Sequence, residues 1–436
     1  MAHRYAPSER RLANGGSVTV NVIATYEIAT ALPLEQAAAV IAGEQSSGTF
    51  VAVARETSEL KARHAATVLS VEELPLSGRP PLPGAVGDWS AARRARIAVE
   101  FPVVNFGPSL PNLLAAVAGN LFELRELGEL RLVDLDVPDV FGTVYAGPAF
   151  GVGGTRRLVG KDGATGPLIG TIVKPSIGLG PDELAGLVEE LALAGIDFIK
   201  DDELQGNPPG FPLAERVSVV MDVLKRTADR TGVMPMYAFN ITDDISNLAR
   251  NHDVVRAAGG TCVMIVVNSV GFAGVQYLRE RAELPIHGHR AMFGAFARSP
   301  QLGIAFRVFQ KLARLVGVDH LHTNGIANKF YETDAEVVAS ITDVRTPLLG
   351  GYHVVPVLSS GQTPAIADIT YAQVGDPGDL LVLAGGGIHA HPGGSGAGVT
   401  AMRDAWDAAV TGEALATRAE RSLALAASLE QFGARP

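Results

Sequence analysis

The chain has 436 residues, of which 47% are hydrophobic and 19% charged, and 36 basic against 46 acidic side chains give a formal net charge of −10. This composition is typical of a globular protein large enough for two domains, and the negative balance argues against a nucleic-acid partner. We find neither an apolar run of the roughly 18 residues that a membrane-spanning helix needs nor a signal-peptide pattern, so we expect a cytoplasmic protein with no membrane partner. The single cysteine, Cys262, lies in the apolar run CVMIVV, which predicts a buried core residue.

The first third of the chain mixes strand-like and helix-like patterns. We expect strands at 17–29, 49–56 and 94–101, and helices at 33–44 and 111–124. Helices on one face of an antiparallel sheet would satisfy these patterns. The sequence therefore predicts an N-terminal α+β domain of the ferredoxin-like type that ends at residue 146.

Strand-like and helix-like patterns alternate in the domain that we assign to residues 147–436. Helical patterns at 181–196, 214–228 and 302–317 lie between short β-rich runs. There are eight such runs, at 170–175, 198–203, 236–241, 262–269, 285–292, 320–325, 354–361 and 380–387. Eight almost continuously apolar strands that alternate with helices predict a (β/α)₈ TIM barrel followed by C-terminal helices, and an open doubly wound sheet is the alternative.

Polar residues, and glycines in one case, lie toward the ends of six of these runs. They are Lys174 on the first, Lys200, Asp202 and Glu203 on the second, His289 and Arg290 on the fifth, His322 on the sixth, Ser359 on the seventh, and Gly385 and Gly386 on the eighth. Each one alone has an ordinary structural explanation, such as a helix cap or a buried histidine. Because the carboxyl ends of barrel strands surround one mouth, their convergence predicts an active site.

The residue types at these strand ends indicate the chemistry. Asp202 and Glu203 are oxygen ligands suited to Mg²⁺, whereas the lysines and histidines suit proton transfer and anion binding. Arg290 and His289 offer donors to one phosphate, and the backbone N–H groups of the AGGG run offer donors to another. These features predict a phosphorylated substrate that is activated beside a carbonyl group.

Several motifs carry a family resemblance that covers nearly the whole chain. They are GEQSSGTF (43–50), GNLFEL (119–124), GTIVKPSIGLGP (170–181), DFIKDDE (197–203), HGHRAMF (287–293), DHLHTNGIANK (319–329), PVLSSG (356–361) and GGGIHAHPGG (385–394). In this order they resemble the ribulose-bisphosphate carboxylase large-chain family, and its carboxylase-like branch more than the CO₂-fixing enzyme. The resemblance implies that Lys200 reacts with CO₂ to form a carbamate, which completes an Mg²⁺ site with Asp202 and Glu203.

The resemblance also implies roles for other residues. Lys174 would be the base that removes a proton beside the substrate carbonyl, and Lys329 would contact a carboxylate from the mobile loop after the sixth strand. The remaining implied contacts are Thr171 and His289 beside the reacting carbons, Arg290 and His322 at one phosphate, Thr49, Gly361, Gly385 and Gly386 at the other, and Ser359 between them. Glu44 and Asn120 would complete the site of a partner subunit, which implies an antiparallel homodimer with composite sites.

Four positions depart from the pattern of the carboxylase: Ser176 replaces a second lysine, Phe50 a tryptophan, Ser360 a glycine and Phe293 a histidine. We therefore expect poor CO₂ fixation. The leading interpretation is an Mg²⁺ enzyme that acts on a phosphorylated keto sugar acid through an enediolate, with carboxyl transfer and hydrolytic cleavage, like the carboxylase-like proteins that convert 3-oxo-isoapionate 4-phosphate to 3-phosphoglycerate and glycolate. The alternatives are an enolase or isomerase of a methylthio-sugar phosphate in methionine salvage, and a non-catalytic binding or redox-response protein.

Overall fold

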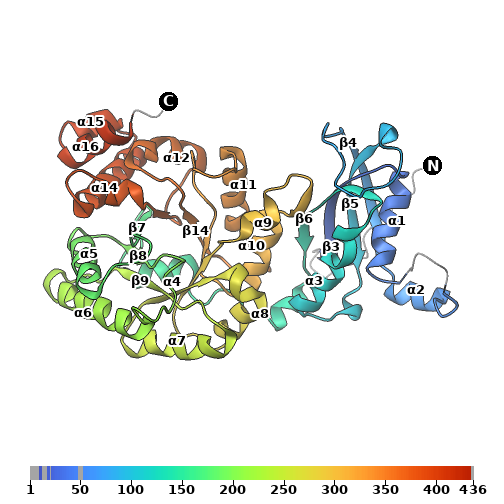
Figure 1. Cartoon of the computed structure of the whole chain (residues 1–436), viewed down its shortest axis with the longest axis horizontal. Helices are drawn as coiled ribbons and strands as arrows, with labels where there is room; N and C mark the ends of the chain where they lie inside the picture. The colour runs from blue at the N-terminus through green and yellow to red at the C-terminus, as the bar shows by residue number, and fades with distance from the viewer. Residues whose placement is uncertain (1–8, 12–16, 20, 48–52, 434–436) are drawn as a thin grey trace. The chain divides into compact units, whose positions relative to one another are not determined.

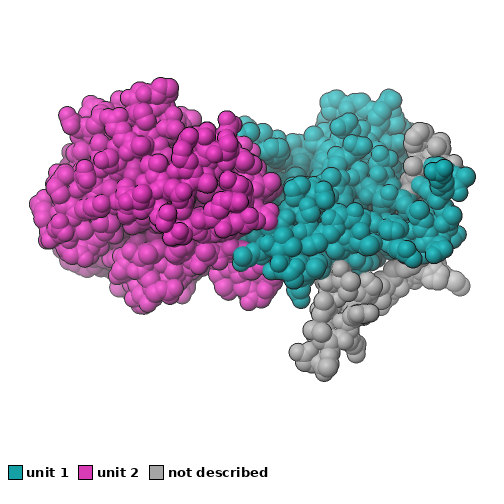
Figure 2. Space-filling model, turned by 90° about the horizontal axis from the view of Figure 1, so that it is seen from below, with its two compact units in different colours: residues 1–146, 292–315 teal, residues 147–291, 316–436 magenta. Residues whose placement is uncertain are grey.

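The computed structural model describes residues 9–11, 17–19, 21–47 and 53–433. They form two compact units, shown in different colours in Figure 2: residues 1–146 with 292–315, and residues 147–291 with 316–436. Residues 292–315 fall within the predicted range 147–436 of the barrel domain, and their strand β12 (Leu302–Ile304) pairs with a strand of the N-terminal sheet. In the described part of the chain, no helix combines the length and the apolar character needed to traverse a bilayer.

The first unit is built on a five-stranded sheet (Figure 1). Its spatial order is β12 (Leu302–Ile304), β6 (Leu127–Asp136), β3 (Val22–Thr30), β5 (Arg93–Phe101) and β4 (Thr67–Leu74). The helices of this unit are α1 (Leu34–Glu44), α2 (Ser58–His64), α3 (Leu110–Ala118), α9 (Phe293–Ala297) and α10 (Phe306–Leu315). The succession β3–α1–β4–β5–α3–β6 with antiparallel pairing is the ferredoxin-like arrangement, and β12 adds a parallel fifth strand beside β6.

Alternation along β3 explains why one face of this sheet is buried. Val22, Ala24, Tyr26 and Ile28 are fully buried, and the residues between them are only partly covered. The Tyr26 hydroxyl donates to the carbonyl of Val117 in α3 at 2.6 Å, which joins the sheet to that helix. A period of two residues is what a strand with one covered face requires.

Two local predictions in this unit were wrong. Residues 53–56, the described part of the strand predicted at 49–56, contain a turn, and the edge strand beside β5 is β4. No residue of β4 is buried, so this edge strand lacks the apolar alternation that would reveal it. The helix predicted at 302–317 begins later, because residues 302–304 form β12 and α10 follows.

The second unit is a closed barrel of eight parallel strands, as predicted (Figure 1). Around the barrel these are β7 (Leu168–Ile172), β8 (Phe198–Lys200), β9 (Met236–Asn240), β10 (Cys262–Val266), β11 (Ile286–His289), β13 (His320–His322), β14 (Val355–Leu358) and β15 (Leu381–Leu383). Its main helices are α4 (Gly151–Leu158), α5 (Pro181–Leu193), α6 (Leu213–Thr231), α7 (Ile245–Ala257), α8 (Val267–Arg279), α11 (Asp334–Arg345), α12 (Ala367–Val374), α14 (Ser395–Thr411) and α16 (Leu423–Phe432). Buried side chains such as Phe198, Met264 and Val357 fill the interior, and Cys262 is buried among them.

Candidate active site

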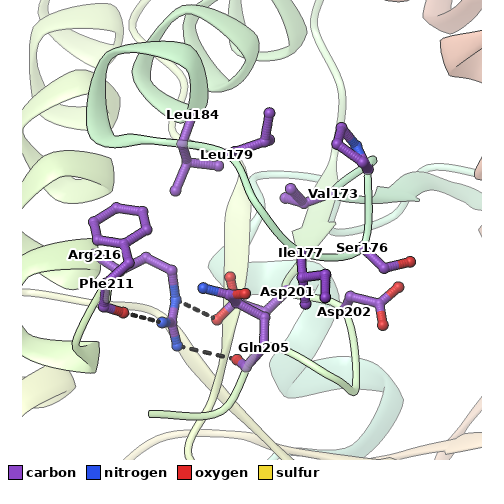
Figure 3. Close-up of a pocket in the computed structure, with 11 residues that line it drawn as sticks. Val173, Ser176, Ile177, Leu179, Leu184, Asp201, Asp202, Gln205, Phe211 and Arg216 are labelled. Carbon is purple, nitrogen blue, oxygen red and sulfur yellow. Dashed lines mark hydrogen bonds and ion pairs between the residues drawn. The ribbon is translucent and has the colours of Figure 1, made fainter. Parts of the chain in front are cut away.

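Directly after β8, the carboxylates of Asp201 and Asp202 point in opposite directions. Asp201 accepts hydrogen bonds from the Tyr237 hydroxyl at 2.7 Å and from Nε of the buried Arg216 at 3.1 Å. Figure 3 shows Asp201 turned toward Arg216, whereas the Asp202 carboxylate lies on the opposite side with Ser176. Asp201 therefore anchors the strand end, and Asp202 is left for the mouth of the barrel.

Lys200 is the last residue of β8 and is fully buried. Its Nζ donates to the carbonyl of Asp201 at 2.8 Å and lies 3.7 Å from Oε2 of Glu203. Burial lowers the pKa of Lys200, against the opposing effect of the nearby carboxylates. A lowered pKa increases the fraction of neutral amine, which is the nucleophilic form.

Lys174 reaches the same carboxylates from the segment after β7. Its Nζ donates to Oδ2 of Asp202 at 2.6 Å and to Oγ of Ser176 at 2.8 Å. Burial raises the pKa of Asp202, but the hydrogen bond and charge of Lys174 outweigh this and hold it below its usual value. A Cβ atom placed on Gly385 would lie 3.7 Å from Cε of Lys174, so the chain after β15 also borders this lysine.

The oxygen ligands at this strand end fit a hard divalent cation only in part. Among the residues that the structure describes, no three His, Cys, Asp or Glu side chains come together as a metal site. Asp202 and Glu203 thus supply two carboxylates, and Nζ of Lys200 lies 3.7 Å from Oε2 of Glu203. His289 borders the same group, with Nε2 at 3.5 Å from Oε2 of Glu203. Conversion of Lys200 to a carbamate would make this donor set suitable for Mg²⁺.

Histidines dominate the opposite part of the mouth, at the ends of β11 and β13. The rings of His289 and His322 pack with centroids 4.4 Å apart. Nε2 of His322 lies 2.8 Å from Nε2 of His287, and its Nδ1 lies 3.1 Å from Oγ of Ser359. Burial first, and then the nearby positive groups, holds the pKa of His289 well below its usual value. Both nitrogens of His322 are therefore engaged inside the barrel.

Arg290 is paired within the same unit. Its guanidinium contacts the buried carboxylate of Glu332 through both terminal nitrogens, one of them at 3.2 Å. Asn324 also donates to this carboxylate. A phosphate at Arg290 would have to share the guanidinium with Glu332 or displace it.

Lys329 lies in the segment between β13 and α11, and its side chain is exposed. Its backbone N–H donates to the carbonyl of Ser360 at 3.1 Å, and a Cβ placed on Gly361 would lie 3.8 Å from the same nitrogen. Ser360 has a φ of 69°, a left-handed conformation that favours glycine, and its hydroxyl donates to Oδ1 of Asn324 at 2.9 Å. This bond helps to explain how a serine is accommodated at a position where the carboxylase has glycine.

The remaining predicted residues lie in different surroundings. Thr171 is buried and donates to the carbonyl of Ala384 at 2.7 Å, with Nε2 of His389 at 3.0 Å. Gly386 begins the short helix α13 (Gly386–His389) and has open space where a side chain would project. In the first unit, Glu44 ends α1 and Asn120 begins the 3₁₀ helix η3 (Asn120–Glu123), which packs against α1; both side chains are exposed. Thr49 and Phe50 lie outside the described residues.

Several polar side chains in the barrel interior or near its mouth were missed from the sequence. They are Thr155, His287, His320, Glu332 and His389. The histidines were visible in the quoted motifs HGHRAMF, DHLHTNGIANK and GGGIHAHPGG, but their sequence spacing does not tell which strand neighbours they meet. The pairing of β11 with β13 supplies that information.

Two family models together match most of the chain. Residues 17–141 match the N-terminal domain, and residues 151–432 the catalytic domain, of the ribulose bisphosphate carboxylase large chain. The chain belongs to the ribulose-bisphosphate carboxylase large-chain family. This confirms the resemblance that the motifs indicated.

Individual members of this family are similar over nearly their full length. A relative from Xanthobacter autotrophicus named 3-oxo-isoapionate-4-phosphate transcarboxylase/hydrolase is 51% identical over 410 residues, which cover 94% of this chain and 98% of the relative. A Rhizobium etli relative named 3-oxo-isoapionate-4-phosphate decarboxylase is 43% identical, with 94% and 98% covered. The crystal structure of a rubisco-like protein from Burkholderia fungorum superposes with a TM-score of 0.86 at 42% identity, covering 95% of this chain and 100% of that one. The names of the two relatives support an enzyme.

Proposed function

We propose that this chain is an Mg²⁺-dependent enzyme that cleaves a phosphorylated 3-oxo sugar acid into two acids. The proposed substrate is 3-oxo-isoapionate 4-phosphate, and the products are 3-phosphoglycerate and glycolate. The observation that carries the proposal is the 51% identity, over nearly the whole of both chains, to a relative named as a transcarboxylase/hydrolase of that compound. The lysines and carboxylates that meet at the ends of β7 and β8 support it.

Asp202, Glu203 and a carbamate on Lys200 would hold the cation. The burial of Lys200 and its lowered pKa support carbamate formation, because the neutral amine attacks CO₂. A cation held there would supply Lewis-acid polarisation of the substrate carbonyl. His289, in contact with Glu203, would border the reacting carbons together with Thr171.

Lys174 would exchange the proton on the carbon beside the carbonyl. Its Nζ is held between Asp202 and Ser176, and a single lysine at this point, where the carboxylase has two, disfavours capture of free CO₂. A 3-oxo acid carries its own carboxyl group, so transfer from one carbon to another proceeds at a high effective concentration. Water then cleaves the carbon–carbon bond to give two acids.

Contacts to the substrate's anionic groups would come from the ends of barrel strands and from Thr49. Arg290 is proposed for one anionic group, and Thr49, Gly361, Gly385 and Gly386 for the phosphate at the other side of the mouth. Lys329, exposed on its loop, would contact the transferred carboxylate after loop closure.

A comparison of three substrate classes tests the proposal. The protein, preincubated with bicarbonate and Mg²⁺, is mixed separately with 3-oxo-isoapionate 4-phosphate, a methylthio-sugar phosphate and ribulose bisphosphate, and products are followed by ³¹P NMR. We expect 3-phosphoglycerate from the first and negligible turnover of the others. An isomerised product from the second alone would favour the salvage isomerase, and no turnover of any would favour a binding protein.

We further propose that the enzyme is a homodimer in which Glu44, Thr49 and Asn120 complete the partner's site. An inactive Glu44→Gln variant mixed with an inactive Lys174→Met variant should then regain activity, because each mixed dimer holds one intact site. Random exchange would restore about a quarter of the wild-type rate. Demonstrated subunit exchange without recovery would contradict a composite site, and each variant incubated alone is the control.

A further inference from the structure

A row of five buried polar side chains crosses the interior of the barrel and ends at the candidate active site. Oγ1 of Thr155 in α4 lies 2.8 Å from Nε2 of His320, and Nδ1 of His320 lies 3.3 Å from Nδ1 of His287. Nε2 of His287 lies 2.8 Å from Nε2 of His322, whose Nδ1 lies 3.1 Å from Oγ of Ser359. Thr155, His320 and His287 have no exposed surface, so bulk water does not reach the contacts between them.

Thr155 fixes the direction in which hydrogen bonds are donated along this row. Oγ1 of Thr155 lies 2.6 Å from the carbonyl oxygen of Gly151, one helical turn earlier. Two oxygens at this distance need a proton between them, and only the hydroxyl can supply it. Thr155 has no second proton, so it must accept from His320, and Nε2 of His320 must carry the hydrogen.

A neutral histidine donates a hydrogen bond through one ring nitrogen and accepts one through the other. The protonated nitrogen of one ring therefore decides which nitrogen of the next ring is protonated. With Nε2 protonated, His320 accepts at Nδ1 from Nδ1–H of His287. His287 in turn accepts at Nε2 from Nε2–H of His322, and His322 accepts at Nδ1 from the hydroxyl of Ser359.

Burial supports the neutral state of all three rings. It lowers the pKa of His320 to about 3 and holds the pKa values of His287 and His322 well below the usual range. The ring of the fully buried Phe198 packs against His287 and His320, with centroids 5.2 and 5.6 Å away. An imidazolium at either position would lose most of its hydration.

We infer that Thr155, His320 and His287 are positioning residues that turn the Ser359 hydroxyl proton into the barrel and leave Ser359 as a hydrogen-bond acceptor toward the substrate. An acceptor suits a substrate hydroxyl and does not suit a phosphate or carboxylate oxygen. In this arrangement the Nε2–H of His322 is directed at His287 and its Nδ1 accepts from Ser359. Only the identity of that hydroxyl rests on the proposed function.

The tautomers can be measured without substrate. Two-bond ¹H–¹⁵N correlation spectra of the histidine-labelled protein distinguish Nδ1–H from Nε2–H rings, and single His287→Gln, His320→Gln and His322→Gln variants assign the signals. We expect His287 as the Nδ1–H tautomer, and His320 and His322 as the Nε2–H tautomer. An Nε2–H or charged His287 would overturn the inference and would leave the proposed reaction untouched.

Removal of the Thr155 hydroxyl tests the consequence for binding. In Thr155→Val the direction is no longer fixed, so His322 should populate both tautomers and KM should rise about tenfold, which corresponds to about 1.4 kcal/mol. Thr155→Ser should restore the wild-type tautomers and KM. Thr370→Val is the matched control, because Thr370 is equally buried and donates in the same way, to the carbonyl of Ile366 at 2.7 Å, but contacts no histidine of the row.

A purely structural role for Thr155 would lower the melting temperature in both valine variants and leave the tautomers unchanged. Unchanged tautomers with an unchanged KM in a folded Thr155→Val protein would overturn the inference. If that variant does not fold, the wild-type spectrum decides alone, since it either has the stated tautomers or does not.

Discussion

The two sides of the barrel differ in whether their polar side chains are charged or neutral. At the ends of β7 and β8, Lys174, Lys200, Asp202 and Glu203 meet as charged or chargeable groups with opposite signs. On β11 and β13, His287 and His322 are buried rings whose pKa values are held well below the usual range, so they carry no charge near neutral pH. The first side depends on charge balance, and the second depends on the direction of hydrogen bonds.

This difference predicts different responses to substitution. On the charged side, loss of one group leaves its partner uncompensated in a partly buried site, which is costly. On the histidine side, a substitution that keeps shape and polarity can preserve function even when one contact changes.

The largest effect is expected at Lys200. Lys200→Ala removes the nitrogen that would form the carbamate and leaves Asp202 and Glu203 as the only proposed cation ligands. Activity should fall about a thousandfold or more, and preincubation with bicarbonate and Mg²⁺, which should activate the wild type, should have no effect on the variant. Lys161→Met is the control, because Lys161 is part-exposed and pairs with Asp197 at 3.5 Å. A fully active Lys200→Ala protein would refute the carbamate.

A smaller and more selective effect is expected at Lys329. Lys329→Met should reduce cleavage about a hundredfold, because the transferred carboxylate loses its cation, while Lys174-dependent exchange of the substrate proton with deuterium continues. Both rates are measured in one NMR sample. Equal loss of exchange and cleavage would show that Lys329 is needed for proton transfer as well, and would favour an enzyme that only enolises its substrate.

The smallest effect is expected at Glu332, the carboxylate that pairs with Arg290. Glu332→Gln keeps the shape and an acceptor for Asn324 but removes the charge that competes with the substrate anion. KM should fall about three- to tenfold, in line with roughly 1 kcal/mol for one charge pair. Glu336→Gln is a matched control, because a glutamine can still complete the capping box with Thr333 at the start of α11. A raised KM in Glu332→Gln alone would show that Glu332 supports the binding geometry instead.

The barrel could be predicted because its buried strands are continuous apolar runs in the sequence. Runs such as MYAFN and CVMIV are buried along their entire length, so they read as apolar segments at regular spacing. The edge strand β4 could not be predicted in this way, because none of its residues is buried. The short β12 was also hidden, since its place beside β6 is set by a contact between residues more than 160 positions apart.

In the active site, too, some contacts could be predicted from the sequence and others could not. The approach of Lys174 to Asp202 follows from the convergence of strand ends and was anticipated by placing both at one mouth. The row from Thr155 to Ser359 could not be foreseen, because it depends on which ring nitrogens face each other across neighbouring strands. A sequence gives the residue type, whereas the tautomer follows from the three-dimensional contacts.

The fate of the substrate carboxyl carbon tests the central claim most directly. The wild-type protein is supplied with 3-oxo-isoapionate 4-phosphate labelled with ¹³C at the carboxylate, in excess unlabelled bicarbonate, and the products are analysed by ¹³C and ³¹P NMR. We predict two acids, one of them phosphorylated, with the label retained undiluted in one of the two. Release of the label into the bicarbonate pool, together with a single phosphorylated ketone, would contradict carboxyl transfer and indicate a decarboxylase.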